Sequence, residues 1–291
     1  MALSKTQVRT LRRVKKAAST TAGTLMKILV CVIFGFPFLW MVATSFKTYV
    51  EAIQFPPTLW PKEFTLEAYI TVFTKLNLGK YIGNSIIILV LVTVGQVLVM
   101  VPAAYAFAKY EFKGKGLLFG MMMVAFMIPT AITYIPIAQM FMEMKIGDTP
   151  MIRTLIPQIV PSLCNAFGIF LLRQNFMQVP EELIESARLD EANEMQIITK
   201  IMLPMAKSTI VNIMMLSMMG TWNSYFWPLV MTYHDEVRPI TIAIQSMKDM
   251  EGGMQWPIIM AGNCILVLPV LILFLAASKK IIAAMAYRGV K

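Results

Sequence analysis

The chain has 291 residues, of which 57% are hydrophobic and only 14% are charged, and its mean hydropathy is +0.66. An ordinary soluble domain carries about 25% charged residues, so this composition excludes that class and indicates a membrane protein. The net charge of +10 would also suit a nucleic-acid partner, which the placement of the charges must decide. The three cysteines are an odd number in separate apolar stretches, which argues against a disulfide framework.

Six runs free of charged residues and histidine approach or exceed the roughly 20 apolar residues that a membrane-spanning helix needs. They are residues 28–46, 81–108, 116–142, 154–172, 208–233 and 252–278. None shows the roughly ten-residue alternation of an outer-membrane barrel strand. The sequence therefore predicts an all-α polytopic membrane protein with six transmembrane helices. A basic segment at residues 1–27 and a tail at residues 279–291 flank them.

The distribution of positive charge predicts the orientation of these helices. An even number of spans places both termini on one side, and 18 of the 26 Lys and Arg residues fall in segments on that side. The positive-inside rule then makes both termini cytosolic. This asymmetry explains the net charge, and we expect no nucleic-acid partner. A secretory signal is the alternative for the first run, but that run is longer than a signal's apolar region of about 7–15 residues.

The segment at residues 173–207, called the coupling loop below, is the least membrane-like part of the chain, with four basic and six acidic residues. Pro180 followed by two glutamates is typical of a helix start. A second helical stretch at residues 195–203 is expected to stop at Pro204. The apolar stripe of the first helix consists of Leu183, Ile184, Ala187 and Ala192. Such helices with an acidic edge favour docking of a soluble partner, and lying on lipid, which usually calls for basic polar faces, is the alternative.

Residues 185–192, Glu-Ser-Ala-Arg-Leu-Asp-Glu-Ala, and residues 201–204, Ile-Met-Leu-Pro, resemble the EAA loop of ABC-importer permeases. That motif reads E-A-A, three residues, Gly, nine residues and then I-x-L-P, and the spacing matches without a gap. The resemblance implies the type I importer permease fold, with a coupling helix that sits in a cleft of an ABC ATPase dimer. The residues implied in ATPase coupling are Glu185, Ser186, Ala187, Asp190, Glu191, Ala192, Ile201, Leu203 and Pro204.

Glu191 departs from the motif, because the family has glycine at this position. Glycine allows the chain to turn at positive φ. Either the turn moves to Asn193, which tolerates that conformation better than most residues, or the turn has another shape.

Four further stretches resemble the second permease subunit of maltose-type oligosaccharide importers, and they occur in the same order. They are residues 38–47, 55–61, 105–108 and 221–229. The resemblance implies a carbohydrate importer of the bacterial cytoplasmic membrane that works by alternating access. The implied partners are a second homologous permease subunit, an extracytoplasmic solute-binding protein and a sugar substrate.

The fifth run contains an aromatic cluster around a polar residue. Asn223 within an apolar span costs free energy unless it pairs or lines a cavity, and the neighbouring aromatic rings offer flat faces with polar tips that suit a sugar. The candidate substrate-pathway residues are Trp222, Asn223, Tyr225 and Trp227. The alternative is an aromatic packing cluster.

Several kinds of chemistry are missing from the sequence. There is no G-x-x-x-x-G-K-[ST] loop, so we expect no enzyme activity and no cofactor in this chain, with ATP and magnesium bound by the partner ATPase. The lone histidine, His234, lacks convergent ligands for a metal. A stand-alone secondary carrier, a permease for a non-sugar solute, and a membrane scaffold or sensor are the competing interpretations.

Overall fold

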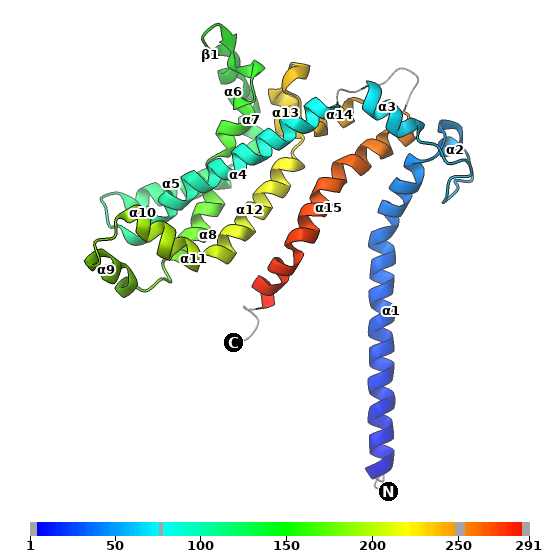
Figure 1. Cartoon of the computed structure of the whole chain (residues 1–291), viewed down its shortest axis with the longest axis horizontal. Coiled ribbons are helices and arrows are strands. Elements are labelled where there is room, and N and C mark those ends of the chain that lie inside the picture. The colour runs from blue at the N-terminus through cyan, green and yellow to red at the C-terminus, as the bar shows by residue number, and fades with distance from the viewer. Residues whose placement is uncertain (1–4, 76–77, 248–253, 287–291) are drawn as a thin grey trace. The chain divides into compact units, whose positions relative to one another are not determined.

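The computed structural model describes residues 5–75, 78–247 and 254–286, and nearly all of its regular structure is helical (Figure 1). The chain divides into two compact units. The first comprises residues 1–74 and 248–265, and the second comprises residues 75–247 and 266–291. The last long helix contributes to both.

The described residues of the first unit form three helices and the beginning of a fourth. These are α1 (Lys5–Ser45), α2 (Tyr49–Ile53), α3 (Glu67–Lys75) and the first part of α15 (Trp256–Ala286). The end of α1 is tied to α3 by a hydrogen bond of 2.9 Å between the hydroxyls of Ser45 and Tyr69.

A buried ion cluster orders the loop that follows α1. Lys47 is only 2% exposed, its Nζ donates to the carbonyl of Thr58, and it lies 4.7 Å from the ring centroid of Trp40. Glu51 is 7% exposed and accepts hydrogen bonds from Thr58 Oγ1 at 2.7 Å and from the Lys62 amide at 2.9 Å. Buried charges are tolerated more readily when they are hydrogen-bonded in this way.

The second unit holds the remaining elements. In chain order they are α4 (Leu78–Lys109), α5 (Lys115–Met127), α6 (Thr130–Glu143), β1 (Lys145–Ile146), β2 (Thr149–Pro150), η1 (Met151–Arg153), α7 (Ile156–Ile159), η2 (Val160–Ser162), α8 (Ala166–Phe176), α9 (Glu181–Leu189), α10 (Glu194–Ile197), the π-helix η3 (Ile198–Met202), α11 (Leu203–Met205), α12 (Lys207–Trp222), α13 (Phe226–Met231), η4 (Asp235–Val237) and α14 (Ile240–Ser246). Strands β1 and β2 form an antiparallel pair with Ile146 opposite Thr149.

The core of the second unit lies between α4 and α8. Fully buried residues of this core include Met100, Ala104, Leu172 and Phe176. The two helices approach closely at Gly168, where an added Cβ would lie 2.6 Å from Met100 Sδ. Close packing of this kind transmits strain from one helix to the other.

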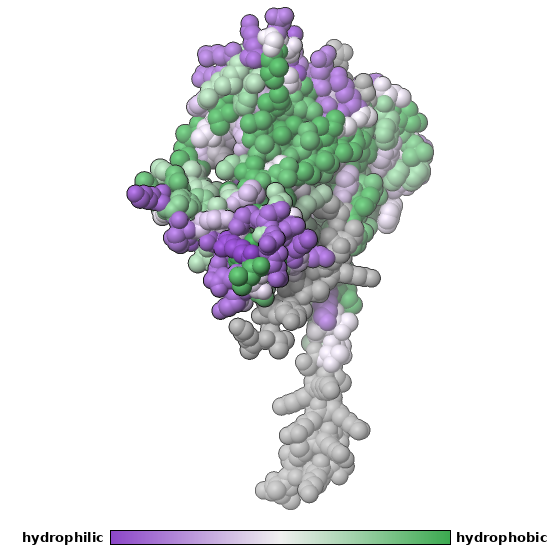
Figure 2. Space-filling model, turned by 60° about the vertical axis from the view of Figure 1, so that its left-hand side comes forward, coloured by the Kyte–Doolittle hydropathy of each residue, from purple (hydrophilic) through white to green (hydrophobic). Residues whose placement is uncertain are grey.

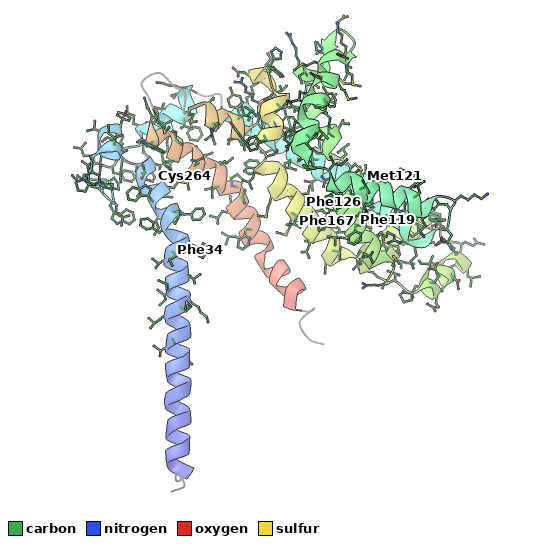
Figure 3. The ribbon with its side chains drawn as sticks, turned by 180° about the vertical axis from the view of Figure 1, so that it is seen from behind. Phe34, Phe119, Met121, Phe126, Phe167 and Cys264 are labelled. Atoms are coloured by element: carbon green, nitrogen blue, oxygen red, sulfur yellow. The ribbon has the colours of Figure 1, made fainter. Side chains whose placement is uncertain are left out.

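Aromatic side chains pack α5 against α8. The rings of Phe126 and Phe167 stack with centroids 5.8 Å apart, and Figure 3 shows both, together with Phe119, on the neighbouring faces of these helices. Phe119 lies 6.4 Å from Phe170 in the same interface. Stacked pairs of this geometry add to the free energy of apolar burial.

Three described helices are long and apolar enough to cross a membrane, at Thr20–Ser45, Leu78–Lys109 and Ile156–Phe176. Two bent helix pairs raise this number to five if each is one span, and Trp256–Ile272 is a shorter apolar helix. The view that brings the α9 side of the molecule forward shows a broad hydrophobic surface with hydrophilic residues gathered below and above it (Figure 2). These features agree with an all-α polytopic membrane protein.

The third and fifth apolar runs are interrupted. The sequence had predicted one continuous helix for each run. The third run is split into α5 and α6 with a bend of 98° at Pro129. Proline lacks an amide hydrogen and disfavours a helical conformation in the residue before it. The fifth run is divided between α12, which ends at Trp222, and α13, which begins at Phe226.

The terminal helices extend beyond the apolar runs. Helix α1 begins at Lys5, within the segment predicted as a basic terminus, and α15 continues to Ala286, within the predicted tail. Residues 1–4, 252–253 and 287–291 of the predicted segments lie outside the described residues.

Candidate functional site

The first helix of the coupling loop, α9, begins and ends where local sequence signals place its ends. Pro180 is the N-cap residue, and Glu181 and Glu182 occupy the first turn, at the positive end of the helix dipole. Ile184 is fully buried in the core between α4 and α8. Leu183, expected in the apolar stripe, is instead 45% exposed, because only one narrow face of this short helix meets the core.

The opposite face of α9 is open to solvent. Glu185 and Ser186 are exposed, while Ala187 is half-buried and packs against the core. Leu189 lies one turn after Glu185, on the same face, and is 85% exposed. An acidic side chain beside an exposed apolar one is a surface that a protein partner can cover.

The turn after α9 is a complete Schellman motif. The amide of Ala192 donates to the carbonyl of Ala187 at 2.9 Å, and the amide of Glu191 donates to the carbonyl of Arg188 at 3.1 Å. Asp190 is the exposed C-cap residue. Glu191 itself takes the left-handed conformation, with φ of 59°.

Both expected alternatives, a turn moved to Asn193 and a turn of another shape, are therefore wrong, because Glu191 keeps the conformation for which glycine is suited. Asn193 has φ of −75° and caps the next helix, α10. Its side chain accepts from the Gln196 amide and the Gln196 side chain accepts from the Asn193 amide, each at 2.9 Å. This reciprocal pair is a capping box.

The second half of the coupling loop packs inward. Ile201 and Leu203 are half-buried against the core between α4 and α8, and Pro204 is exposed. The helical segment Glu194–Met205, formed by α10, η3 and α11, ends one residue after Pro204, close to the stop expected at that proline. The chain bends after Ala206, and the axes on the two sides differ by 82°.

A polar cluster closes the coupling loop against the end of α4. Tyr105 Oη donates to Glu194 at 2.6 Å, and Arg188 donates to the same carboxylate at 3.1 Å. The hydrogen bond from Tyr105, followed by the contributions of Tyr110 and Arg188, lowers the pKa of Glu194 despite partial burial. Glu194 is thus held in its ionised form.

The aromatic residues of the fifth run do not form one surface. Trp222 is 6% exposed, and its indole nitrogen donates to the Leu266 carbonyl at 3.0 Å. Asn223 is exposed and bonds its own helix at the Met219 carbonyl. Tyr225 and Trp227 are both half-buried, and the Trp227 indole donates to the Pro157 carbonyl at 3.1 Å.

Sequence reasoning singled out Tyr105 only as part of a resemblance, and it missed the contacts of Lys109. These two residues are four apart on α4, and they touch the coupling loop more than 70 residues further along the chain. A polar pair at helical spacing at the end of an apolar run was the available signal. Within the described residues, no group of three His, Cys, Asp or Glu could hold a metal ion.

Solved structures define the class of fold. A bacterial ABC transporter chain involved in import of the acidic polysaccharide alginate aligns with a TM-score of 0.76 and 21% identity, covering 92% of this chain and 97% of that one. The structure of the alginate ABC transporter in complex with an alginate pentasaccharide-bound periplasmic protein aligns with a TM-score of 0.64 and 17% identity. The alignment covers 91% of this chain and 94% of that one. The fold is that of an ABC-importer permease.

The sequence comparisons define the family. The family model for the binding-protein-dependent transport system inner membrane component matches residues 100–281, and the chain belongs to this family. The arabinooligosaccharides transport system permease protein AraQ of Halalkalibacterium halodurans is 29% identical, over 88% of this chain and 91% of its own. The inner membrane ABC transporter permease protein YcjP of Escherichia coli is 28% identical, over 90% and 93%. The sn-glycerol-3-phosphate permease UgpE of Brucella abortus is 25% identical, over 89% and 93%.

Proposed function

We propose that this chain is a transmembrane permease subunit of an ATP-driven carbohydrate importer that works by alternating access. The observation that carries the proposal is the coupling loop, whose motif residues fold into a helix with Glu185 exposed on one face and Ile184 buried on the other. The carbohydrate substrate is supported by relatives named for arabinooligosaccharides and by solved importers of alginate. A relative named for glycerol 3-phosphate supports a phosphorylated polyol as the second candidate.

The energy source in this proposal is a separate ABC ATPase dimer that docks on the coupling loop. Glu185, Ser186 and Asp190 are exposed and would face the ATPase. The Schellman turn would hold Ala187, Glu191 and Ala192 in place. Ile201, Leu203 and Pro204 would set the second half of the loop. ATP and magnesium would be bound by the ATPase alone.

The other partners follow from the same proposal. A second homologous permease would complete the translocation pathway, and an extracytoplasmic binding protein would deliver the sugar. The protein would lie in the bacterial cytoplasmic membrane. The coupling loop and both termini would then face the cytosol, which the excess of Lys and Arg on that side favours. Among the candidate pathway residues, exposure supports Asn223 most directly, whereas Trp222, Tyr225 and Trp227 are buried or half-buried.

The decisive experiment combines co-purification with transport. The tagged chain is solubilised mildly from its own membranes, as wild type and as Glu185→Lys. We expect an ATPase and a second permease with the wild type, and loss of the ATPase with the variant, because the reversed charge faces the docked subunit. Glu143→Lys, the same change at an exposed residue outside the coupling loop, is the matched control and should retain the ATPase.

Uptake then separates the competing functions. Proteoliposomes that contain the co-purified complex and the binding protein should accumulate labelled arabinooligosaccharide or alginate oligosaccharide only with internal ATP. Uptake driven by an ion gradient without ATP would support a stand-alone secondary carrier instead. Uptake of glycerol 3-phosphate in preference to both sugars would instead identify a phosphorylated polyol as the substrate.

A further inference from the structure

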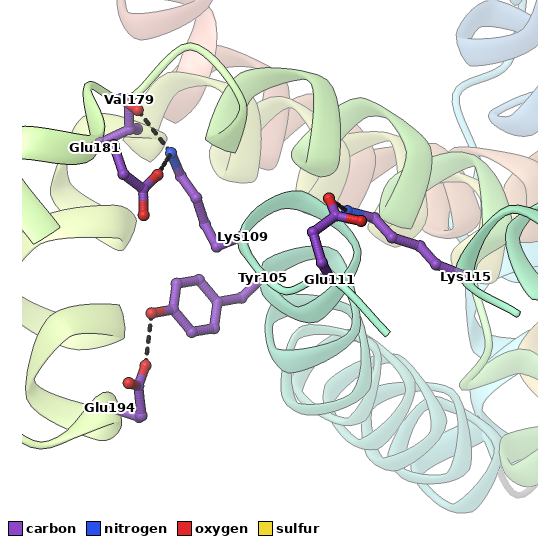
Figure 4. Close-up of polar contacts among 7 residues, drawn as sticks. All are labelled: Tyr105, Lys109, Glu111, Lys115, Val179, Glu181 and Glu194. Atoms are coloured by element: carbon purple, nitrogen blue, oxygen red, sulfur yellow. Dashed lines mark hydrogen bonds and ion pairs between the residues drawn. The ribbon is translucent and has the colours of Figure 1, made fainter. Parts of the chain in front are cut away.

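Two polar side chains in the last turn of α4 reach the helix starts of the coupling loop, in addition to the Arg173 bond to the Phe107 carbonyl and the apolar packing of the shared core. Lys109 Nζ donates to Glu181 at 2.9 Å and to the Val179 carbonyl at 2.7 Å, at the start of α9. Tyr105 Oη donates to Glu194 at 2.6 Å, at the start of α10. Figure 4 shows the two contacts side by side, reaching from α4 to the coupling loop.

Burial makes these contacts different from ordinary surface pairs. The Lys109 side chain is 6% exposed and Tyr105 is 3% exposed. A cation withdrawn from water to this extent needs its partners, because an unpaired buried charge is strongly unfavourable. The contacts therefore constrain where α9 and α10 lie, whereas exposed ion pairs constrain little.

The opposite end of α4 is attached to a second loop, residues 233–240, called the outer loop below. Asn84 Nδ2 donates to the carbonyls of Glu236 at 2.9 Å and Arg238 at 3.0 Å. The Ile240 amide donates to Ser85 Oγ at 2.9 Å, and this bond is buried. Three hydrogen bonds thus fix the outer loop to one turn of α4.

The two attachments are far enough apart along α4 to lie near opposite faces of a hydrocarbon core. Asn84 and Tyr105 are 21 residues apart on one helix, which corresponds to about 32 Å at 1.5 Å per residue. The core of a bilayer is about 30 Å thick. Between them α4 packs on α8 at Met100, and the helix continues without a break through Pro102, so one helix joins the two loops.

The covalent connections of the coupling loop to α8 and α12 do not by themselves link it firmly to the outer loop. The coupling loop leaves α8 through the short segment at residues 177–180 and re-enters the helical bundle across the 82° bend at α12. A bend can flex when α9 is displaced. Direct contacts with α4 bypass that bend.

We propose that α4 is the element that carries displacement between the coupling loop and the outer loop, and that Tyr105 and Lys109 are the positioning residues that connect it to the ATPase-bound helix. This inference rests on the proposed function. When the ATPase dimer moves α9, the two contacts make α4 and the outer loop move with it. The number of ATP molecules hydrolysed per transported solute then depends on the contacts made by Tyr105 and Lys109.

The test uses the intact complex in proteoliposomes with its binding protein and either arabinooligosaccharide or alginate oligosaccharide as the probe. The combined variant Tyr105→Phe with Lys109→Gln removes the hydroxyl donor and the charge. We expect the ATPase to co-purify at the wild-type level and to hydrolyse ATP, while the ATP consumed per solute rises about fivefold to tenfold, the size of a typical coupling between sites.

Two further variants keep the result interpretable. Glu111→Gln is the control for loss of a lysine–glutamate ion pair near this end of α4, since it breaks the more exposed pair of Lys115 with Glu111 at 2.7 Å, to which the coupling loop contributes neither residue (Figure 4). It should leave the ATP cost unchanged. The exchange Lys109→Glu with Glu181→Lys restores an ion pair and should recover most of the coupling that Lys109→Glu alone loses.

The outcomes separate this inference from the proposed function. If wild type shows no ATP-dependent uptake of any probe, the proposed function fails. If wild type transports and the combined variant keeps the wild-type ATP cost, the role of α4 is overturned while the function stands. A variant that loses uptake only in proportion to a lower amount of assembled complex also overturns the role, because the contacts would then serve folding alone.

Discussion

The amide of Ala192 donates to the carbonyl of Ala187 at 2.9 Å, and this bond holds the intervening Glu191 in the left-handed conformation. A residue with a Cβ pays about 1–2 kcal/mol for that conformation, and glycine does not. We expect Glu191→Gly to stabilise the protein by about 0.5–1 kcal/mol, since the greater freedom of glycine in the unfolded chain offsets part of the gain. Thermal unfolding of the detergent-solubilised protein measures this. Glu191→Ala keeps the Cβ and should give no such gain; equal stabilisation by alanine would contradict the conformational explanation.

The loop after α1 is expected to lose order in acid. Burial alone would raise the pKa of Glu51, but hydrogen bonds from Thr58 and the Lys62 amide, together with the charge of Lys47, outweigh burial and hold the pKa below its ordinary value of 4.5. A carboxyl whose pKa is lowered on folding stabilises the folded state above that ordinary value, and this stabilisation is lost as the pH falls through the folded-state pKa.

Pepsin cleavage within residues 46–66 reports on this loss. The wild type should resist at pH 5 and become cleavable toward pH 3. Glu51→Gln cannot ionise, so it should be cleaved at both pH values, and comparison of the two proteins at each pH removes the effect of pepsin's own activity. Identical cleavage profiles for the two proteins would show that Glu51 does not order the loop.

The buried and exposed members of the aromatic cluster should behave differently on substitution. Trp222→Phe removes the hydrogen bond to the Leu266 carbonyl, which should cost about 1 kcal/mol of stability and leave the KM for solute unchanged. Asn223→Ala alters an exposed side chain that bonds only its own helix, so it should change the KM with little effect on melting. Transport kinetics and thermal unfolding of both variants measure these two effects. The reverse pattern would place Trp222 on the substrate path and Asn223 in the packing.

The contact between α4 and α8 leaves no room for a side chain at Gly168. An added Cβ would lie 2.6 Å from Met100 Sδ, and Met100 is fully buried. Gly168→Ala should therefore destabilise the protein by about 1–3 kcal/mol. Gly83→Ala, in α4 but with no atom within 4 Å of the added Cβ, should instead be neutral or stabilising. Equal melting temperatures for the two variants would argue against close packing at Gly168.

Sequence patterns predicted the features that depend on near neighbours. The start of α9 at Glu181 follows from Pro180 and two acidic residues, and the apolar runs follow from composition. The contact of Tyr105 with Glu194 could not be predicted in this way, because 89 residues separate them and only the packing of α4 brings them together.

Prolines and short apolar stripes were the weaker signals. Pro204 was expected to end its helix directly, and the helical segment continues one residue further, to Met205, before the chain bends by 82°. Leu183 was expected in the buried stripe, but it is exposed, whereas Ile184 is fully buried and Ala187 and Ala192 pack against the core. Both differences arise because tertiary packing selects among locally acceptable alternatives.

The bend between α5 and α6 has a consequence for biosynthesis. Their 13 and 14 residues correspond to about 20 and 21 Å of helix, so neither crosses a hydrocarbon core of about 30 Å alone. The insertion machinery, which reads hydrophobicity along the chain, meets one continuous apolar stretch there. Pro129 favours the bend locally, but the packing of α6 is completed later, because Phe141 clusters with Ile152 and Met231, which are synthesised afterwards. We therefore expect this segment to partition into lipid before it reaches its final packing.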